Sequence, residues 1–407
     1  MTPHRHPRHR PTAVLLAALA LAAAAPAAPG SREPAPAPLH RTSGTAVTGH
    51  YIVTLRSGGS PRTLAARLGV TPDIVYRHAF LGFAAKLSAG QLDTVRRAPD
   101  VAAVEEDALF HASGSRGPRP GRAAASSWGL DRIDQRNLPL DGQFNVNGTG
   151  RGVTAYIVDT GIDYAQQEFG GRAGKGVDLV DPNGDGSDCP TGSGHGTHVS
   201  GIVGGAQHGV ARGVSLVSVR VLDCGGSTST ARFVQGLDWV AQNADSASVL
   251  NASINGPSSS ATDSAVNTIA NKGILPVVSA GNAEGGADAT NACGNSPGGA
   301  PGAVPVGATD QTDHMTAFSD WGTCVRLLAP GNEIVSARMG GGTETMSGTS
   351  QAAPHVTGVA ALYRAAHPDA TARAVTDWLT SSDVATQIPR ANVRDSTPNR
   401  LLYTGGL

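Results

Sequence analysis

Three short polar segments, far apart in the chain, limit what this sequence can fold into more than any other feature. They are YIVDTGID around Asp159, GSGHGTHVSG around His195 and MSGTSQAAPHVTG around Ser350. A serine hydroxyl is a weak nucleophile until an imidazole takes its proton, and that imidazole needs a carboxylate that fixes its tautomer and stabilises its charged form. The chain has a candidate for each role, so we expect a fold that brings the three segments together in one catalytic centre.

The local sequence places each candidate at the boundary of a regular element. The apolar run Val153–Val158 predicts a buried parallel strand, and Asp159 follows it at the carboxyl end, where open α/β sheets carry their active sites. His195 and Ser350 each precede a run of residues with the spacing of a buried helix. The N–H groups and the positive dipole end of such a helix favour an oxyanion beside Ser350. The alternative for Ser350 is an ordinary helix N-cap.

The order Asp, His, Ser, with these flanking residues, resembles the subtilase family of serine proteases, nearest to its proteinase K-like branch. The resemblance implies an α/β fold, namely a subtilisin-like three-layer domain with a mostly parallel sheet. It also implies a serine endopeptidase in which Ser350 attacks the peptide carbonyl, His195 acts as base and then acid, and Asp159 orients His195. In the segment PVVSAGN the resemblance assigns the oxyanion donor to Asn282, although an asparagine after glycine is more often a turn residue.

The composition divides the chain into five segments. They are a signal peptide (1–28), a disordered spacer (29–49), an inhibitory prodomain (50–112), a cleavable linker (113–127) and the peptidase domain (128–407). The uninterrupted apolar run Ala13–Ala25 is too short to span a membrane and is typical of a signal peptide, so we expect a secreted, extracellular protein with no membrane partner.

Residues 50–112 alternate strand-like and helix-like patterns, from YIVTLR to VAAVEED, and predict a small α+β domain. This segment resembles the inhibitory prodomain that precedes many subtilases. The resemblance implies that the chain binds its own prodomain as an inhibitor and processes itself from a prepro-precursor. The alternative is an unrelated small binding domain.

All four cysteines lie in the predicted peptidase domain. An even number of cysteines in an exported chain favours disulfides over free thiols, and a zinc site is disfavoured because no CxxC pair is present. The sequence alone permits three pairings. Relatives of the proteinase K-like type imply two bonds, Cys189 with Cys224 and Cys293 with Cys324.

The charge balance argues against a nucleic-acid partner. Charged residues make up 15% of the sequence and the formal net charge is −1, whereas nucleic-acid binding demands a basic face. As the resemblance implies a protease, we expect its partners to be protein or peptide substrates, and we expect a monomer. No cofactor is expected for catalysis.

Structural calcium is a further hypothesis. Asp181, Asp185 and Asp188 lie in the tight turn DPNGDGSD, whose carboxylates are typical of hard-cation loops. By resemblance, a second group near the start of the peptidase domain consists of Asp131, Asp134 and Gln135. The alternatives are a solvated acidic turn and a helix cap. In CVRLLAPG, Arg326 occupies the place of a calcium-ligating aspartate of proteinase K-like enzymes, which implies that this site is lost.

The substrate-binding strand departs from the family pattern. Where relatives have SLGG, this chain has Ser253, Ile254, Asn255 and Gly256. The resemblance places the first specificity pocket between this strand and a second segment, Ser279, Ala280 and Gly281, and implies a broad, weakly apolar preference. A side chain at Asn255 would narrow that pocket or tilt the strand. Two other functions remain open: a catalytically silent secreted domain, and a protease restricted to one target or to chain ends.

Overall fold

The computed structural model describes residues 1–2, 35–116, 127–283 and 288–407. The predicted signal peptide and most of the predicted linker lie outside these ranges. No helix among the described residues is long and apolar enough to cross a membrane. Residues 36–407 belong to one packed unit, so the prodomain and the peptidase domain are described together.

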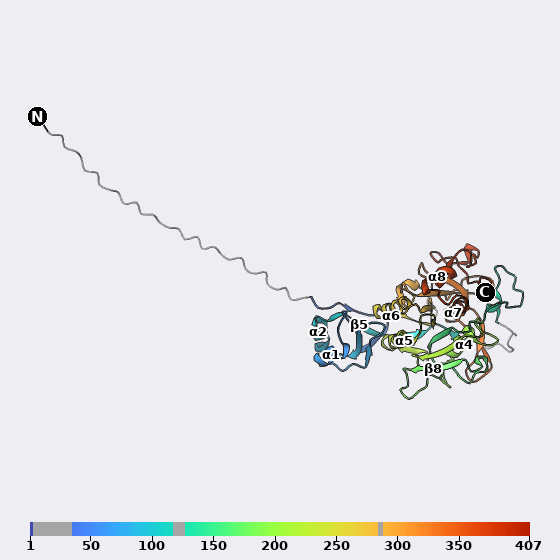
Figure 1. The fold of residues 1–407 in the computed structure, drawn as a ribbon, viewed down its shortest axis with the longest axis horizontal. Coiled ribbons are helices and arrows are strands. Elements are labelled where there is room, and N and C mark those ends of the chain that lie inside the picture. Colours follow the sequence, from blue (N-terminus) through green and yellow to red (C-terminus); the bar gives the residue numbers. More distant parts are fainter. Residues whose placement is uncertain (3–34, 117–126, 284–287) are drawn as a thin grey trace. The chain divides into compact units, whose positions relative to one another are not determined.

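The first folded part is an α+β domain with two helices on one sheet (Figure 1). Its elements are β1 (Leu39–His40), β2 (Ala46–Leu55), α1 (Pro61–Arg67), β3 (Ile74–Tyr76), β4 (Gly82–Lys86), α2 (Ala89–Arg97) and β5 (Val101–Ala112). Strand β2 lies between β4 and β5 and is antiparallel to both. Apolar side chains of the sheet and the helices form a core of their own.

This domain begins earlier than the sequence indicated. The predicted disordered spacer is wrong from Leu39 onward, because Leu39 and His40 pair with β5 and β2 starts at Ala46. The prolines and small residues before Leu39 suggested a spacer. The pairing that orders residues 39–49 comes from β5, which lies much later in the chain.

The peptidase domain is built on a seven-stranded sheet, counted over the described residues, in the order β16-β15-β13-β11-β7-β9-β8. All six neighbouring pairs are parallel. The strands are β7 (Thr154–Asp159), β8 (Ala173–Asp178), β9 (Ser215–Arg220), β11 (Val249–Ala252), β13 (Leu275–Ser279), β15 (Val304–Thr309) and β16 (Leu327–Pro330). The parallel arrangement puts the carboxyl ends of all seven strands at one edge.

Helices cover both faces of this sheet. Alternate residues of β7 point to opposite sides: Ile157 packs in one core with α4 (His195–Gly204) and α7 (Thr349–Ala366). Val158 packs in the other core with α5 (Thr230–Asn243) and α6 (Ser260–Asn271). Figure 1 shows these helices around the sheet. The α/β prediction of a three-layer domain with a mostly parallel sheet is therefore confirmed.

Shorter elements complete the domain. They are β6 (Ser115–Arg116), α3 (Trp128–Ile133), β10 (Ser227–Ser229), β12 (Ile254–Pro257), β14 (Asn295–Ser296), β17 (Ile334–Ala337), β18 (Thr343–Ser347), α8 (Ala372–Thr380) and the 3₁₀ turns Gln167–Phe169, Ala292–Gly294 and Arg390–Asn392. Two disulfides join Cys189 to Cys224 and Cys293 to Cys324, the pairing that the resemblance implied.

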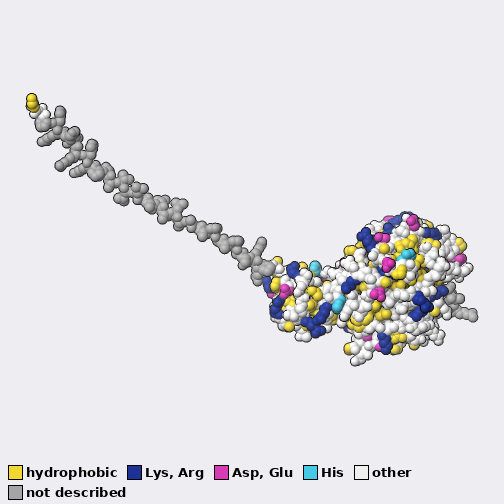
Figure 2. Space-filling model, viewed as in Figure 1, with side chains coloured by type: hydrophobic (Ala, Val, Ile, Leu, Met, Phe, Trp, Pro, Cys, Tyr) yellow, Lys and Arg dark blue, Asp and Glu magenta, His cyan; other side chains and the backbone are white. Residues whose placement is uncertain are grey.

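Positive and negative side chains are dispersed in small groups over the face drawn in Figure 2.

Strand β5 connects the two domains. Its first part pairs with β2 in the prodomain, and its last part lies between β10 and β12 of the peptidase domain, antiparallel to both. The resulting sheet has eight strands among the described residues. The end of the prodomain is therefore a strand of the peptidase domain as well.

Carboxylates hold the two domains together on either side of β5. Asp238 of α5 accepts the main-chain N–H groups of residues 77–79 through one oxygen, at 2.7–3.0 Å. In the other direction, Asp107 accepts the N–H of Ala231 in the first turn of α5, at 2.9 Å. Glu105 accepts the N–H of Ala261 in the first turn of α6, at 3.2 Å. Negative side chains at helix N-termini satisfy donors that have no partner within the helix.

A buried ion pair fixes α3 against the strand layer. Arg132 has no exposed surface, and its guanidinium donates to both oxygens of Asp313, at 2.6 and 3.0 Å. It also donates to the carbonyls of Gln135 and Arg136. Removing one charge would leave the other buried without its partner.

We expect Asp313→Ala to lower the free energy of unfolding by about 3–5 kcal/mol, because Arg132 would remain buried and uncompensated. Urea unfolding of the protein in a Ser350→Ala background, which prevents self-digestion, measures this. The double variant Arg132→Met with Asp313→Ala removes both charges with the same substitution at residue 313, whose φ is 62°, and should be more stable than Asp313→Ala alone. Equal stability of the two variants would contradict a role for the unpaired charge.

Candidate active site

Asp159 and His195 form a buried pair at the carboxyl edge of the parallel sheet. Asp159 is the last residue of β7 and has no exposed surface. His195 is the first residue of α4, and its Nδ1 lies 2.8 and 3.0 Å from the two carboxylate oxygens of Asp159. The Asp159 Oδ1 atom also accepts the N–H of Thr160 at 2.7 Å. The carboxylate therefore holds the ring in one orientation and leaves Nε2 free to face the substrate.

A second carboxylate, that of Asp188, bonds to residues that lie next to this pair. Asp188 is buried and accepts four hydrogen bonds, from the hydroxyls of Thr160 and Thr197 and the N–H groups of Thr197 and Cys189, at 2.6–3.1 Å. Thr160 in turn accepts the N–H of Gly196 through Oγ1, at 2.9 Å. Asp188 was expected in a metal loop, but the structure places it under the first turn of α4.

Ser350 lies in the first turn of α7, one residue after the helix begins, so it is not the N-cap, which is Gly348. Pro354 has no N–H to donate to the carbonyl of Ser350, and that carbonyl accepts the hydroxyl of Ser253 instead, at 3.0 Å. In return, the Ser350 Oγ atom donates to the carbonyl of Ser253 at 3.2 Å. His195 Nε2 is buried and makes no hydrogen bond in this state.

The carbonyl oxygen of Ser113 sits between two donors beside Ser350. The N–H of Ser350 donates to it at 3.1 Å, and the Nδ2 of Asn282 donates to it by a short hydrogen bond. Asn282 is held in this orientation because its Oδ1 accepts the N–H and the hydroxyl of Thr349, at 3.0 and 2.9 Å. This pair of donors has the arrangement of an oxyanion hole.

The chain on either side of Ser113 is extended along the same cleft. The N–H of Ser113 donates to the carbonyl of Ser253 at 3.1 Å, and Ala112 and His111 pair with Ile254 and Asn255 of β12. The side chain of Ser113 contacts Asn255 and Ser279. Of the residues expected to bind substrate, Ser253, Ile254, Asn255 and Ser279 are brought together here.

The other two residues of that expected set, Ala280 and Gly281, lie in the turn before Asn282. Ala280 donates its N–H to the carbonyl of Val306, and Gly281 donates its N–H to the hydroxyl of Thr349. Gly281 has a φ of 111°, which favours glycine, and a Cβ atom there would collide with Asp320. These two residues form the turn that carries Asn282 from β13 into the cleft.

Gly114, the residue after the held carbonyl, lies against the base. A Cβ atom added to Gly114 would be 3.0 Å from His195 Nε2 and 3.1 Å from Gln351 Oε1. The nitrogen of the Ser113–Gly114 bond therefore belongs to the same small space as Nε2. Candidates for a nucleophile, a base, an orienting carboxylate and an oxyanion hole therefore lie around one peptide bond. These are the groups that acyl transfer requires.

Two models of known protein families match parts of this chain. The model of the subtilase family matches residues 150–402, and the model of peptidase inhibitor I9 matches residues 70–113. The chain belongs to the subtilase family. The predicted family, enzyme class and prodomain are thereby confirmed: it is a subtilisin-like serine proteinase with an I9 prodomain.

Individual relatives agree with this assignment. An extracellular serine proteinase of Thermus sp. (strain Rt41A) is 45% identical over 345 residues, which cover 84% of this chain and 80% of that protein. Alkaline serine exoprotease A of Vibrio alginolyticus is 47% identical over 289 residues, 71% of this chain and 52% of the relative. The crystal structure of a cold adapted subtilisin-like serine proteinase matches with a TM-score of 0.64 and 48% identity, over 69% of this chain and 99% of that one.

The side chains proposed for calcium bond to nearby groups of their own chain in this structure. Within the described ranges, no three His, Cys, Asp or Glu groups are arranged to hold a metal ion. The carboxylates of Asp131 and Asp134 accept N–H groups of residues 141–145, and Gln135 donates to the carbonyls of residues 137 and 139. The alternative of a hydrogen-bonded cap therefore fits this group better than a set of cation ligands.

The acidic turn is likewise committed to local partners. Asp181 accepts the N–H of Asn183 at 2.9 Å, and Asp185 accepts the N–H of Ser187 at 3.0 Å and pairs with Lys175 at 3.1 Å. Hydrogen bonds from Ser187 and Lys175 lower the pKa of Asp185 to about 2. Arg326 is exposed beside the α8 helix. The contacts favour the interpretation of residues 181–185 as a solvated turn, whereas Asp188 is buried.

Sequence reasoning missed three residues that shape the site: Thr160, Thr349 and Gln351. Each lies directly beside a predicted catalytic residue, and that position was the only signal available.

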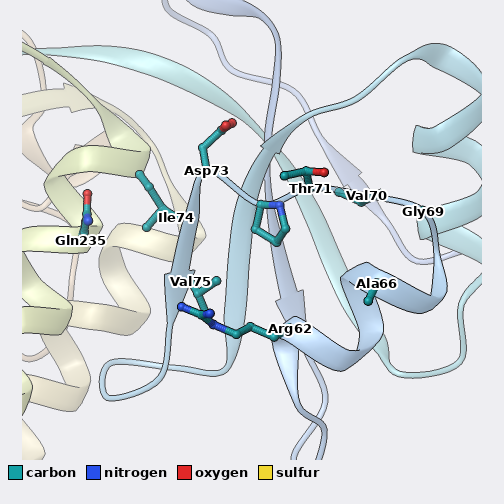
Figure 3. Close-up of a pocket in the computed structure, with 10 residues that line it drawn as sticks. Arg62, Ala66, Gly69, Val70, Thr71, Asp73, Ile74, Val75 and Gln235 are labelled. Atoms are coloured by element: carbon teal, nitrogen blue, oxygen red, sulfur yellow. The ribbon is translucent and has the colours of Figure 1, made fainter.

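Figure 3 shows a different cavity, of about 810 Å³, lined by α1 and β3 of the prodomain together with Gln235. None of the catalytic candidates lines it.

The pKa of His195 is shifted in the opposite direction from the pKa values of two other buried histidines. Burial alone would lower the pKa of His195, but the charge of Asp159 and the hydrogen bond to it outweigh burial, so the pKa is raised above its ordinary value of 6.5. By contrast, burial lowers the pKa of His198 to about 3 and that of His355 to about 4. Of these three histidines, His195 alone has a pKa above the ordinary value.

We expect kcat/KM for peptide hydrolysis to fall about tenfold per pH unit as the pH drops below the raised pKa of His195, because the protonated ring cannot act as base. Initial rates on a short peptide between pH 5 and 9 measure this limb. Circular dichroism at the same pH values controls for unfolding. A rate that stays constant down to pH 5, with the fold intact, would contradict this role of His195.

Proposed function

We propose that this chain is a secreted serine endopeptidase that processes itself from a prepro-precursor at the Ser113–Gly114 bond. Its domains are a signal peptide over residues 1–28, a prodomain ending at Ser113 and a peptidase domain after it, working as a monomer on protein or peptide substrates. One observation carries the proposal: the Ser113 carbonyl is held by the N–H of Ser350 and by Asn282, with Gly114 against His195.

The proposed reaction uses the groups in the positions described above. The Ser350 hydroxyl leaves the carbonyl of Ser253, gives its proton to His195 Nε2, and forms a bond between Oγ and the Ser113 carbonyl carbon. The negative charge on the carbonyl oxygen is stabilised by Asn282 and the N–H of Ser350. Hydrogen-bond geometry in a resting state commonly tightens only in the reacting complex, so the Ser350–Ser253 bond is compatible with this step.

The intermediate then breaks toward the Gly114 side. The C–N bond of Ser113–Gly114 cleaves, and His195 gives the proton to the departing Gly114 nitrogen. A water molecule, deprotonated by His195, attacks the resulting ester and releases Ser350 and a carboxylate on Ser113. Throughout, Asp159 holds the ring and stabilises its charged form. The chain's own bond reacts readily because it is presented at high effective concentration.

The prodomain is proposed to inhibit the enzyme after this cut. Support comes from the strand pairing of residues 109–112 with β10 and β12, which occupies the cleft that a substrate would need. The carboxylate contacts of Asp107, Glu105 and Asp238 add attachments outside the cleft. A new substrate can bind only when this strand has left.

We expect Ser350→Ala to be secreted as an uncut precursor and the wild type to yield a chain that begins at Gly114. His195→Ala should behave like Ser350→Ala, because the loss of either member of a catalytic unit removes nearly all of the activity of that unit. Ser258→Ala, which removes an exposed serine, is the matched control and should mature normally. N-terminal sequencing of the secreted chains reads the result. A short form of Ser350→Ala, made in a host that lacks other proteases, would exclude self-cleavage.

Asn282→Ala should reduce kcat about a hundred- to a thousandfold while KM changes little, since the donor acts mainly on the charge that develops during reaction; this is the loss known for the equivalent donor of subtilisin. Hydrolysis of unfolded casein and of a short peptide, with active sites titrated by a sulfonyl fluoride, gives both constants. If Asn282→Ala retained the wild-type kcat, Asn282 would not be the oxyanion donor. Complete inactivity of the wild type on casein would favour the silent-domain alternative.

A further inference from the structure

The side chain of Ser113 lies in a small polar recess formed by Asn255 of β12 and Ser279 of β13, which we call the hydroxyl recess. Asn255 Nδ2 donates to the Ser113 Oγ at 2.7 Å, and the hydroxyls of Ser279 and Ser113 are 3.2 Å apart. Ser113 is 4% exposed and Ser279 is fully buried. The residue that supplies the held carbonyl is therefore contacted through its hydroxyl group.

Asn255 is fixed in place by groups other than the bound chain. Its Nδ2 lies 2.6 Å from the Oγ and 3.2 Å from the carbonyl oxygen of Ser279, so its two N–H groups are shared among these acceptors and the Ser113 Oγ. Its backbone is held within β12, which pairs with β5 on one side and with β14 on the other. The recess is therefore organised by β12 and β13 together, and the Asn255 amide cannot turn away without losing its bonds to Ser279.

The recess has little tolerance for a large apolar side chain. Asn255 Oδ1 is already buried without a hydrogen-bond partner. A phenyl ring in the place of the Ser113 hydroxyl would have to displace the amide and would leave Nδ2 and the Ser279 hydroxyl without their present partners. Buried polar groups that lose their partners are strongly unfavourable, and a site built to bond a hydroxyl discriminates against side chains that lack one.

We propose that this subtilase cleaves preferentially after serine, and that Asn255 is the residue that determines this specificity. The proposal replaces the broad, weakly apolar preference implied by the family pattern, and it rests on the proposed function. Asn255 supplies both parts of the selection, because its amide binds the hydroxyl and its volume excludes an aromatic ring. Ser279 contributes only to the first part.

A set of peptide anilides Phe-His-Ala-Xaa, with the sequence of residues 110–112 before the varied position, tests the proposal directly. For the wild type we expect kcat/KM with serine at Xaa to exceed that with alanine by about tenfold and that with phenylalanine by more than about a hundredfold. Asn255→Gly should reverse the order of serine and phenylalanine. The matched variant Ser279→Ala should reduce the ratio of serine to alanine without admitting phenylalanine.

Self-processing offers a second readout in the full chain. A precursor with Ser113→Phe should mature at least about tenfold more slowly than the wild type, and the addition of Asn255→Gly should restore the rate. This rescue would not occur if Asn255 were merely structural. Titration with a sulfonyl fluoride and thermal melting establish that each variant has a folded active site.

The outcomes separate this proposal from the proposed function. A wild type that prefers phenylalanine, or an Asn255→Gly variant with an unchanged peptide profile, would overturn the role of Asn255 while leaving an active serine protease. Loss of all hydrolysis, with no labelling of Ser350 by the sulfonyl fluoride, would instead overturn the proposed function.

Discussion

The parallel register of the central sheet is the constraint on which the site depends. Because β7 and β13 run in the same direction, their carboxyl ends reach the same edge, and Asp159 and the turn before Asn282 are delivered there together. Helices α4 and α7 begin at that edge and bury it from one face. A charged aspartate can be buried at this point only because the ring of His195 and a main-chain N–H satisfy its oxygens.

Much of this arrangement could be predicted from the sequence, since its signals are local. The apolar run before Asp159, the glycine-rich entry to His195 and the helical spacing after Ser350 each mark an element and its end. The cysteine pairs depended on resemblance to relatives. The sequence patterns thus indicated these individual elements, whereas the mostly parallel three-layer sheet was implied by the resemblance to subtilases.

Other features could not be predicted, because their partners come from distant segments. Asp188 lies in an acidic turn that is typical of cation loops, yet its oxygens bond to Thr160 and Thr197, which no local pattern connects with it. The spacer before His50 is ordered by pairing with β5, more than fifty residues later in the chain. Asn255 could be recognised as unusual, but its bonds to Ser279 become visible only when β12 and β13 are side by side.

The two domains share their charges as well as their strands. Prodomain carboxylates accept N–H groups at the starts of α5 and α6, while a carboxylate of α5 accepts three N–H groups of the prodomain. Each such contact supplies a hydrogen-bond acceptor to main-chain N–H groups that would otherwise need a water molecule as acceptor. Helices of the peptidase domain therefore receive acceptors for their N-terminal N–H groups from the prodomain.

Strand β5 has a further consequence for the lifetime of the processed protein. The proposed hydrolysis at its end would break a covalent bond but none of the ladder hydrogen bonds that join the strand to β10 and β12. The severed domain is then held as the middle strand of a continuous sheet, and it can leave only by a cooperative opening in which both flanking ladders separate together. Departure of the prodomain would thus resemble local unfolding, so its rate constant would rise steeply with temperature and fall with the stability of the sheet.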